Sequence, residues 1–586
     1  MEHPDGRRAG EPGMTYMFRR LTAWLEGEDR RSWKILAGLS LVSPVVDVFS
    51  FSALLLIINR ALRENRAAPG LILFTLGMAG LSGLKCLLEL YKDRLSQRFV
   101  YGGAQRLSLK VYELLMKEDL TAHNEKSPMQ AMALVRQDTT SCIQALASCI
   151  GIGAGAVTLA GYAAVLIRVS GWAGAASSAA LALIVAGVYR RNRKRVRAWG
   201  ERSRACSIRA NSQITIAYGS FKEMKIDDRF ALVLENYRAA SRGYAQAQSE
   251  YQHQSGSTGV ILQNSVMGAL FVVVAVILAA GSRLTAVLTP LMAYITALVR
   301  ALPLAYGILR GLNSVEFAQE PFSALEEALT RYEALKKEEA RAAELRRKEL
   351  TFQRGLSVQG LTFAYREGRN IFEDASVDIP VGCSVAVIGP SGVGKTTFLD
   401  LILGLLKPQG GSVFYDDYDL AAQRDGEGPC RGDVGRLVSY IPQTVYLNGE
   451  TIRGNVAFFA REEEIDDGKV EECLRCAQIW EDVEQLPQGV RTVIGENGTA
   501  ISGGQRQRVA LARALYKDFE LLVMDEATAA LDMETERAVI DSIRQVKGGK
   551  TLLMVTHHMS LANECDYIYR IENRKIVPVK GPVGGR

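Results

Sequence analysis

The chain has 586 residues, 48% of them hydrophobic, and a formal net charge of +6. This length predicts two or more domains and excludes a single small one. Composition and charge fit a soluble protein as well as a membrane protein, so the choice between these two classes rests on the spacing of apolar residues. Long apolar runs alternate with basic stretches up to about Leu304, and a soluble α/β pattern follows from Phe322.

Six apolar runs are long enough to cross a membrane, for which about 20 residues are needed. Before them, Phe18–Leu25 is typical of a short interfacial helix within a polar start, and no secretory signal is expected. The fourth run is short and alanine-rich, which also fits a buried helix of a soluble protein. The runs lie near Trp33–Ile58, Leu71–Leu90, Cys142–Ile167, Gly171–Tyr189, Thr258–Ala280 and Leu284–Leu304.

The gaps between the runs predict which side of the membrane each end faces. Tyr91–Ser141 and Arg190–Ser257 are long and polar, whereas only three residues separate runs three and four or runs five and six. The long gaps indicate helices that project beyond the bilayer on one side. A basic cluster after the fourth run marks that side as cytoplasmic and favours lipid headgroups over nucleic acid as its contact. The cluster consists of Arg190, Arg191, Arg193, Lys194, Arg195 and Arg197.

Nine cysteines are scattered without a disulfide framework. Cys473 and Cys476 form a lone CxxC pair in a helical, charged context. Because there is no second pair, we expect both cysteines to be reduced and structural, and metal binding is the alternative.

A phosphate-binding loop follows the predicted strand Ser384–Ile388, and Thr397 opens the next helix. Its glycines let backbone N–H groups point at phosphates, and the helix start adds a positive dipole end. We expect Lys395 to contact the β- and γ-phosphates and Thr396 to bind Mg²⁺. The residues predicted to bind nucleotide here are Gly389, Pro390, Ser391, Gly392, Val393, Gly394, Lys395, Thr396 and Thr397.

Two further strands end in residues suited to ATP hydrolysis. Asp525 ends the apolar strand Leu521–Met524, where an acid can hold Mg²⁺ through water, and Glu526 can act as general base on the attacking water. His557 follows the strand Thr551–Val555 and is expected at the γ-phosphate. The adjacent His558 is the alternative, and we favour His557.

The segment Ile501-Ser502-Gly503-Gly504-Gln505 lies between the phosphate loop and Asp525-Glu526. With these motifs in this order, Gly355–Ile576 resembles the nucleotide-binding domain of ATP-binding cassette (ABC) transporters. From Trp33 onward the chain resembles an exporter half-transporter, a six-helix membrane domain followed by one α/β P-loop cassette. The domains expected are an N-terminal segment (1–32), a membrane domain (33–320), a charged linker (321–350) and the cassette (351–586).

The resemblance implies roles for further residues. Tyr365 would stack on adenine, and Gln443 would sense the γ-phosphate and bind Mg²⁺ together with Thr396 and Asp525. Asp532, in Ala530-Leu531-Asp532, would communicate between paired sites. Ile501 stands where the family usually has Leu, and Ala529-Ala530 where it has Ser-Ala; neither substitution touches a catalytic position. The residues implied to reach the ATP of a second cassette are Ser502, Gly503, Gly504 and Gln505.

The expected function is ATP-driven export or flipping of an amphiphilic substrate by alternating access in the cytoplasmic membrane. The expected partner is a second copy of the chain, or a different half-transporter, with both termini and the cassettes cytoplasmic. Coupling helices are expected in Leu120–Asp138 and Asn211–Asp227. A soluble ATPase would lack the six runs, whereas an ATP-gated channel or regulatory subunit would keep the fold without pumping.

The substrate stays open. Asp47, Lys85, Glu89 and Arg300 are ionisable residues inside predicted spans, and such residues are functional candidates. They either form a polar cavity or serve structure, with Asp47 and Lys85 locking two helices and Arg300 reaching the headgroups. Val299–Pro303 faintly resembles the sixth span of lipid-linked oligosaccharide flippases. Peptide or drug export is the alternative, but a processing peptide exporter would carry a protease domain before the first span.

Overall fold

The computed structural model describes residues 13–64, 69–279, 284–344, 350–366, 368–420, 431–458, 460–526, 533–546 and 549–581. These residues form two compact units. The first comprises residues 1–118 and 122–334 and is helical, and the second comprises 119–121 and 335–586 and contains all the strands described here. Most of the charged segment predicted as a linker, 321–350, is helix α11 (Gln319–Glu344), and the division between the two units falls within this helix.

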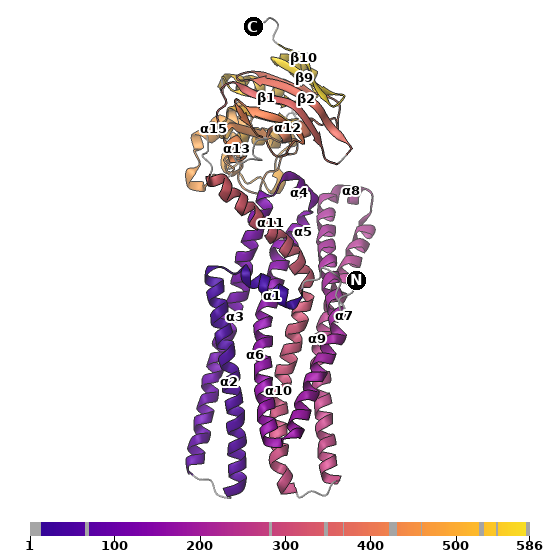
Figure 1. Cartoon of the computed structure of the whole chain (residues 1–586). Coiled ribbons are helices and arrows are strands. Elements are labelled where there is room, and N and C mark those ends of the chain that lie inside the picture. Colours follow the sequence, from indigo (N-terminus) through magenta and orange to yellow (C-terminus); the bar gives the residue numbers. More distant parts are fainter. Residues whose placement is uncertain are drawn as a thin grey trace. The chain divides into compact units, whose positions relative to one another are not determined.

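The first unit is a bundle of long helices (Figure 1). The six predicted spans lie in six helices of at least 32 residues, except that Gly171 precedes its helix and Ala280 lies outside the described residues. These helices extend past the apolar runs, as the long polar gaps predicted. They are α2 (Gly27–Glu64), α3 (Pro69–Lys117), α6 (Thr139–Ser170), α7 (Trp172–Gly219), α9 (Phe230–Ala279) and α10 (Leu284–Phe317).

Short elements join the long helices within the two polar gaps. The first gap contains α4 (Leu120–Glu125), α5 (Pro128–Met132) and a π-helical turn (Ala133–Asp138). The second contains α8 (Phe221–Ile226). Both gaps therefore hold short helices where coupling helices were predicted. The second unit includes Asp119–Thr121, and Leu120 packs against its core.

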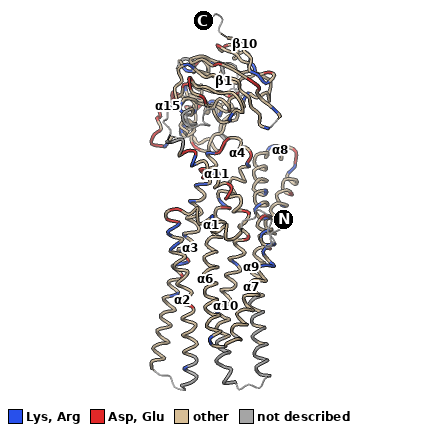
Figure 2. Tube along the Cα trace, in the orientation of Figure 1, with Lys and Arg blue, Asp and Glu red and all other residues tan. Residues whose placement is uncertain are grey.

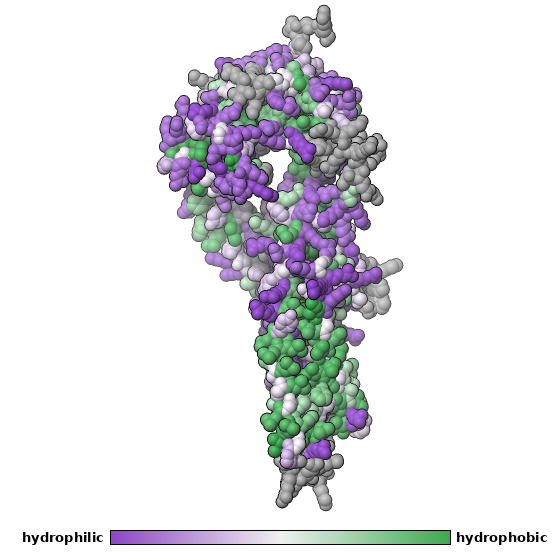
Figure 3. Space-filling view, turned by 90° about the vertical axis from the view of Figure 1, so that its left-hand side faces the viewer, coloured by the Kyte–Doolittle hydropathy of each residue, from purple (hydrophilic) through white to green (hydrophobic). Residues whose placement is uncertain are grey.

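The bundle has the inverted polarity of a membrane protein. Large apolar side chains point outward, for example Leu73 and Leu183, each 73% exposed, whereas the charged pair Asp47 and Lys85 points inward. Figure 3 shows a continuous hydrophobic surface on this unit, and Figure 2 shows few charged residues along the same part of the bundle. A soluble bundle would present the opposite pattern.

Among the described residues, four helical segments are long and apolar enough to cross a membrane. The predicted fourth and fifth spans, in α7 and α9, include residues whose side chains lie outside the described part, so this count does not test them. Residues 280–283, between the fifth and sixth predicted spans, lie outside the described part. The four segments are Gly27–Ile57, Pro69–Lys117, Pro128–Val169 and Tyr294–Phe317.

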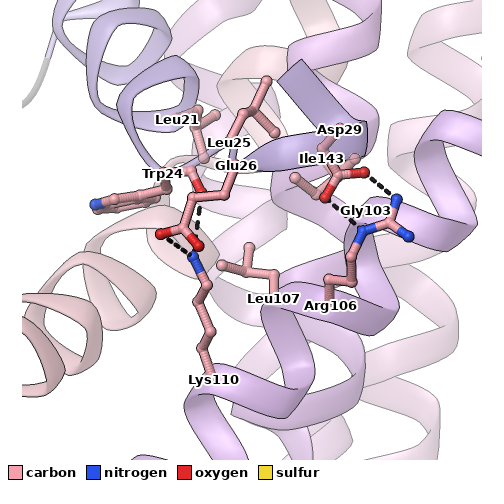
Figure 4. Close-up of a pocket in the computed structure, with 10 residues that line it drawn as sticks. All are labelled: Leu21, Trp24, Leu25, Glu26, Asp29, Gly103, Arg106, Leu107, Lys110 and Ile143. Atoms are coloured by element: carbon pink, nitrogen blue, oxygen red, sulfur yellow. Dashed lines mark hydrogen bonds and ion pairs between the residues drawn. The ribbon is translucent and has the colours of Figure 1, made fainter. Parts of the chain in front are cut away.

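The predicted interfacial helix is α1 (Met14–Ala23), which buries Met17 and Leu21. The turn after it is fixed to α3 by two ion pairs around a small cavity of about 60 Å³ (Figure 4). Lys110 lies 2.8 Å from Glu26. Arg106 donates hydrogen bonds to both carboxylate oxygens of Asp29, and the bond from its Nε is 2.7 Å long. Because every charge in this cavity has a partner, its role is to hold the N-terminal segment on the bundle.

The ionisable residues inside the spans are paired with one another. Lys85 donates to Asp47 across α2 and α3 and lies 3.4 Å from Glu89. The structure thus contains the pair of Asp47 and Lys85 between two helices, which the sequence analysis gave as one of two hypotheses. Arg300 of α10 lies near Tyr162 of α6.

The second unit is built on two sheets. An antiparallel sheet has the order β2-β1-β4-β5, and a six-stranded sheet has the order β10-β9-β3-β8-β7-β6, parallel except for β10. Buried side chains fill the space between and beside them. The strands are β1 (Gly355–Ala364), β2 (Asn370–Pro380), β3 (Ser384–Ile388), β4 (Gly410–Tyr415), β5 (Tyr418–Asp419), β6 (Val438–Ile441), β7 (Leu521–Asp525), β8 (Thr551–Val555), β9 (Tyr567–Glu572) and β10 (Lys575–Lys580).

The second unit also contains helices, and four of those described, α14 to α17, follow one another in the sequence between β6 and β7. Cys473 and Cys476, both in α15, are buried in the hydrophobic core. The helices are α12 (Lys395–Ile402), α13 (Arg431–Leu437), α14 (Ile452–Val456), α15 (Asp467–Cys476), α16 (Trp480–Glu484), α17 (Gly503–Tyr516), α18 (Met533–Val546) and α19 (Met559–Glu564), with 3-10 turns at Glu462–Glu464, Gly489–Arg491 and Glu496–Gly498.

One buried ion pair fixes the middle of the helical unit. Asp138, at the end of the π-helical turn, is fully buried, and Arg204 of α7 donates to both its carboxylate oxygens at 2.8–3.1 Å. Removing one member of such a pair leaves an uncompensated buried charge and costs about 3–5 kcal/mol.

We therefore expect Arg204→Gln to lower the thermal unfolding midpoint by about 5 °C or more. Labelling of Cys142 by a thiol-reactive dye would report unfolding, because this cysteine is fully buried. Arg209→Gln, at an exposed position of the same helix, is the matched control. Equal midpoints for the two variants would show that the pair contributes nothing to stability.

Candidate ATP-hydrolysis site

Four neighbouring parallel strands bring the predicted catalytic residues to one edge of the sheet. In the order β3-β8-β7-β6, the carboxyl ends of these strands lead to Lys395, His557, Glu526 and Gln443 respectively. Ligands of open α/β sheets bind outside the carboxyl ends of the strands. Hydrophobic sequence makes this possible, because β3, β7 and β8 are buried along their whole length.

The phosphate loop has the backbone shape that the sequence predicted. Gly394 has a φ of +113°, and a Cβ there would lie 2.6 Å from Ile371 Cγ2. Only glycine therefore suits this position, both for its backbone angle and for the close approach of β2. Lys395 is 6% exposed and folds back on the loop, donating to the carbonyl oxygens of Gly389 and Pro390 at 3.1 and 3.2 Å.

Glu526 is held from three directions. Gln443 Nε2 donates to one carboxylate oxygen at 2.9 Å, while His557 Nε2 lies 2.6 Å and Lys395 Nζ 3.5 Å from the other. Lys395 Nζ is also 3.3 Å from His557 Nε2. This arrangement orients the Glu526 carboxylate beside Lys395 of the phosphate loop. His558 instead begins α19 and donates its backbone N–H to Thr556 Oγ1.

The backbone of Glu526 adopts a left-handed conformation, with a φ of +49°. Its N–H remains bonded to the carbonyl oxygen of Val555 at 3.0 Å. Such strain in a non-glycine residue is found mostly at functional sites. No sequence signal predicted this conformation, which turns the Glu526 side chain away from the direction of β7.

Asp525 and Thr396 provide the candidate magnesium ligands. Thr396 Oγ1 donates to Asp525 Oδ2 at 3.0 Å. Burial raises the pKa of the Asp525 carboxyl above its usual range; the Thr396 hydrogen bond and Lys395 act against this shift, and Glu526 adds to it. A bound cation would relieve this burial penalty. No group of three His, Cys, Asp or Glu side chains suited to a metal occurs among the described residues. Mg²⁺ at a nucleotide is usually bound by one or two protein oxygen ligands together with substrate phosphates.

Tyr365 and the Ser502–Gln505 segment lie in separate parts of the unit. Tyr365 follows β1 and is 54% exposed. Its ring packs edge-on against Phe363, with the ring centres 5.0 Å apart, and its hydroxyl forms a hydrogen bond of 3.3 Å with Thr397 Oγ1. Ser502 caps α17, where its hydroxyl and the side chain of Gln505 close a capping box at 3.2 and 2.9 Å. The serine hydroxyl is therefore bonded within its own segment. Asp532 lies outside the described residues.

The comparisons with known proteins agree with this geometry. Residues 372–529 match the family model described as ABC transporter. Over these residues the second unit is similar to that family. The whole chain also superposes on a bacterial Atm1-family ABC exporter solved with ATP bound, with a TM-score of 0.75, 20% identity and 94% of both chains covered. The chain has the fold of an ABC exporter half-transporter, and it is a multi-pass membrane protein.

The curated relatives match over a shorter stretch. The ATP-dependent lipid A-core flippase of Cupriavidus pinatubonensis is 39% identical over 223 residues, which is 38% of this chain and 37% of the flippase. The flippase of the same description from Vibrio cholerae is 38% identical over 223 residues, again 37% of its length. The chain thus matches little more than a third of the length of these relatives.

The position of Lys395 predicts how its loss would act. Lys395→Ala removes the charge predicted to contact the β- and γ-phosphates. We therefore expect ATP to bind at least about tenfold more weakly, since a charge-assisted hydrogen bond contributes about 1.5–3 kcal/mol. Titration with a fluorescent ATP analogue measures this. Lys407→Ala, at an exposed position soon after the same helix, should bind like the unmodified protein. Unchanged affinity in Lys395→Ala would contradict the assignment.

Proposed function

We propose that two copies of this chain, or this chain and a second half-transporter, export or flip an amphiphilic substrate across the cytoplasmic membrane at the expense of ATP. The observation that carries the proposal is the Glu526 carboxylate, oriented by Gln443 and His557 beside Lys395 at the sheet edge. Glu526 accepts a proton from the attacking water, and Lys395 binds the phosphate oxygens where charge develops. Mg²⁺, bound by Thr396, Asp525 and Gln443, would neutralise phosphate charge.

The proposal of a second copy rests on the position of Ser502, which bonds within its own segment. Its segment is exposed and bonded to itself at the start of α17, and a helix start of this kind binds anions. In the proposed assembly, Ser502–Gln505 of one copy contacts the ATP held by Lys395 of the other, and Asp532 communicates between the sites. Bound ATP then favours the closed pair of cassettes, and its hydrolysis lets the two cassettes separate. The helical units alternate between inward and outward access as the cassettes close and open.

The orientation rests on the basic cluster at Arg190–Arg197, which begins as α7 leaves its apolar part. Arg193 of this cluster is 2.9 Å from Glu316, and the others add positive charge where cytoplasmic headgroups are expected. The cassette binds cytoplasmic ATP, so we place it and both chain ends in the cytoplasm. The flippases similar to this chain favour an amphiphilic, lipid-like substrate over the alternative of a peptide or a drug.

The test of the proposed chemistry is Glu526→Gln. We expect ATP still to bind but its turnover to fall by about 10²–10⁴-fold, because the general base is lost, and the cassettes to stay paired around unhydrolysed ATP. Phosphate release and retention of radiolabelled ATP after gel filtration measure the two effects. Glu572→Gln, at an exposed position on β9, is the matched control. Rapid ATP turnover by Glu526→Gln would show that Glu526 is not the general base.

Transport itself separates an exporter from a channel or regulatory subunit of the same fold. ATP-dependent accumulation of substrate in sealed inside-out vesicles supports pumping. ATP hydrolysis without accumulation, or flux that follows the gradient once ATP is bound, would support the channel reading instead.

A further inference from the structure

Strand β1 continues beyond the point where its pairing with β4 stops. Thr362 pairs with Gly410, the first residue of β4. Extending this pairing by two residues on each strand would bring Pro408 opposite Ala364, but proline has no N–H to donate to a neighbouring strand. The pairing of β1 with β2 also shifts register directly before Ala364. The end of β1, which leads to Tyr365, therefore needs another support.

The side chain of Gln409 takes the place of the missing strand residue. Its Oε1 accepts a hydrogen bond from the Ala364 N–H at 2.8 Å, and its Nε2 donates to the Ala364 carbonyl oxygen at 2.9 Å. The backbone N–H of Gln409 donates to the carbonyl oxygen of Thr362 at 2.9 Å. A glutamine amide offers both a donor and an acceptor, so it can bond both backbone groups of one residue. Ala364 is buried, and its backbone groups would be costly to leave unbonded.

Tyr365, the next residue, is fixed from a second direction. Its hydroxyl is hydrogen-bonded to Thr397 of α12, and its ring packs against Phe363. Because α12 begins at the phosphate loop, the ring lies between the end of β1 and the helix of that loop. Tyr365 is still more than half exposed, so ring surface remains available for a flat ligand.

We propose that Gln409 is a positioning residue for nucleotide binding. By holding the backbone of Ala364, it sets the direction in which Tyr365 presents its ring to the adenine. This inference rests on the proposed function, in which the cassette binds ATP and Tyr365 stacks on the base. The amide of Gln409 is engaged with Ala364, so its effect on the nucleotide passes through Tyr365. A ring that is already held in place loses less conformational entropy when the base binds.

Two ligands separate the base from the phosphates. A nonhydrolysable ATP analogue carries both, whereas tripolyphosphate carries phosphate groups alone. Isothermal titration calorimetry measures the binding of each to the full chain in nanodiscs with Mg²⁺. Gln409→Leu keeps the size of the side chain but cannot bond Ala364. We expect it to weaken binding of the ATP analogue about threefold to tenfold, since two neutral hydrogen bonds that orient the ring are lost, and to leave tripolyphosphate unaffected.

Steady-state ATP hydrolysis gives a second readout. The KM for ATP should rise in Gln409→Leu, whereas kcat should change by less than about twofold, because a residue that acts only on binding of the base leaves the chemical step intact. A residue that merely holds the fold together would lower kcat and the amount of active protein together.

Further variants test whether Gln409 acts through Tyr365. Tyr365→Ala should weaken the ATP analogue about fivefold or more, the loss typical of one aromatic–base stack. Adding Gln409→Leu to Tyr365→Ala should then have no further effect, because residues that act through one another are not additive. Gln409→Glu has the same length and still accepts from the Ala364 N–H but cannot donate, so its effect should be intermediate. Gln353→Leu, at an exposed position before β1, is the matched control and should bind both ligands normally.

The outcomes distinguish this inference from the function on which it rests. Normal affinity of Gln409→Leu for the ATP analogue overturns the positioning role and leaves ATP-driven export standing. Equal weakening of the ATP analogue and tripolyphosphate also overturns it, because the change would then act on the phosphate loop. A further loss in the double variant would show that Gln409 does not act through Tyr365. Failure of the unmodified chain to bind either ligand would contradict the proposed function, and this inference with it.

Discussion

The arrangement of four parallel strands is the constraint on which the ATP site depends. Lys395, His557, Glu526 and Gln443 are up to 162 residues apart in sequence, yet each follows the carboxyl end of one of four adjacent strands. Strands buried on both faces cannot slip in register without exposing apolar side chains. The packing of β3, β7 and β8 thus fixes the spacing of the catalytic groups, and loops need only carry them a few residues further.

Glu526 shows how the rigid sheet is combined with local strain. The strand delivers Asp525 in an extended, buried conformation, and the next residue turns into a left-handed one while keeping its bond to Val555. The two adjacent carboxylates consequently serve different partners, Asp525 facing Thr396 and Glu526 facing Gln443 and His557. Separate surroundings for neighbouring acids are a common way to give them separate roles.

Sequence predicted the elements that carry the candidate site where motifs are local, but it did not predict which side chains meet across the fold. The phosphate loop and the Asp525-Glu526 strand end are contiguous patterns with a direct physical reason, and the structure forms both. The capping box of Ser502 also follows from spacing alone. The contact between Gln443 and Glu526 depends on strand order, which no local pattern contains. In the helical unit, the sequence offered Asp47 and Lys85 as a pair between two helices, whereas the buried pair of Asp138 and Arg204 emerged only from the packing of the helices.

Polar residues inside the helical unit fall into two kinds that differ in energy. Asp138 and Arg204, like Asp47 and Lys85, satisfy each other, so they can stay buried and hold helices in fixed contact. Gln248 and Arg310 have no hydrogen-bond or ion-pair partner among the described residues, but Gln248 is half-buried and Arg310 is exposed, so water can satisfy both side chains. Buried polar groups need a protein partner, whereas groups that reach water do not. The paired residues therefore fix contacts between helices, and the water-exposed residues add no such contact.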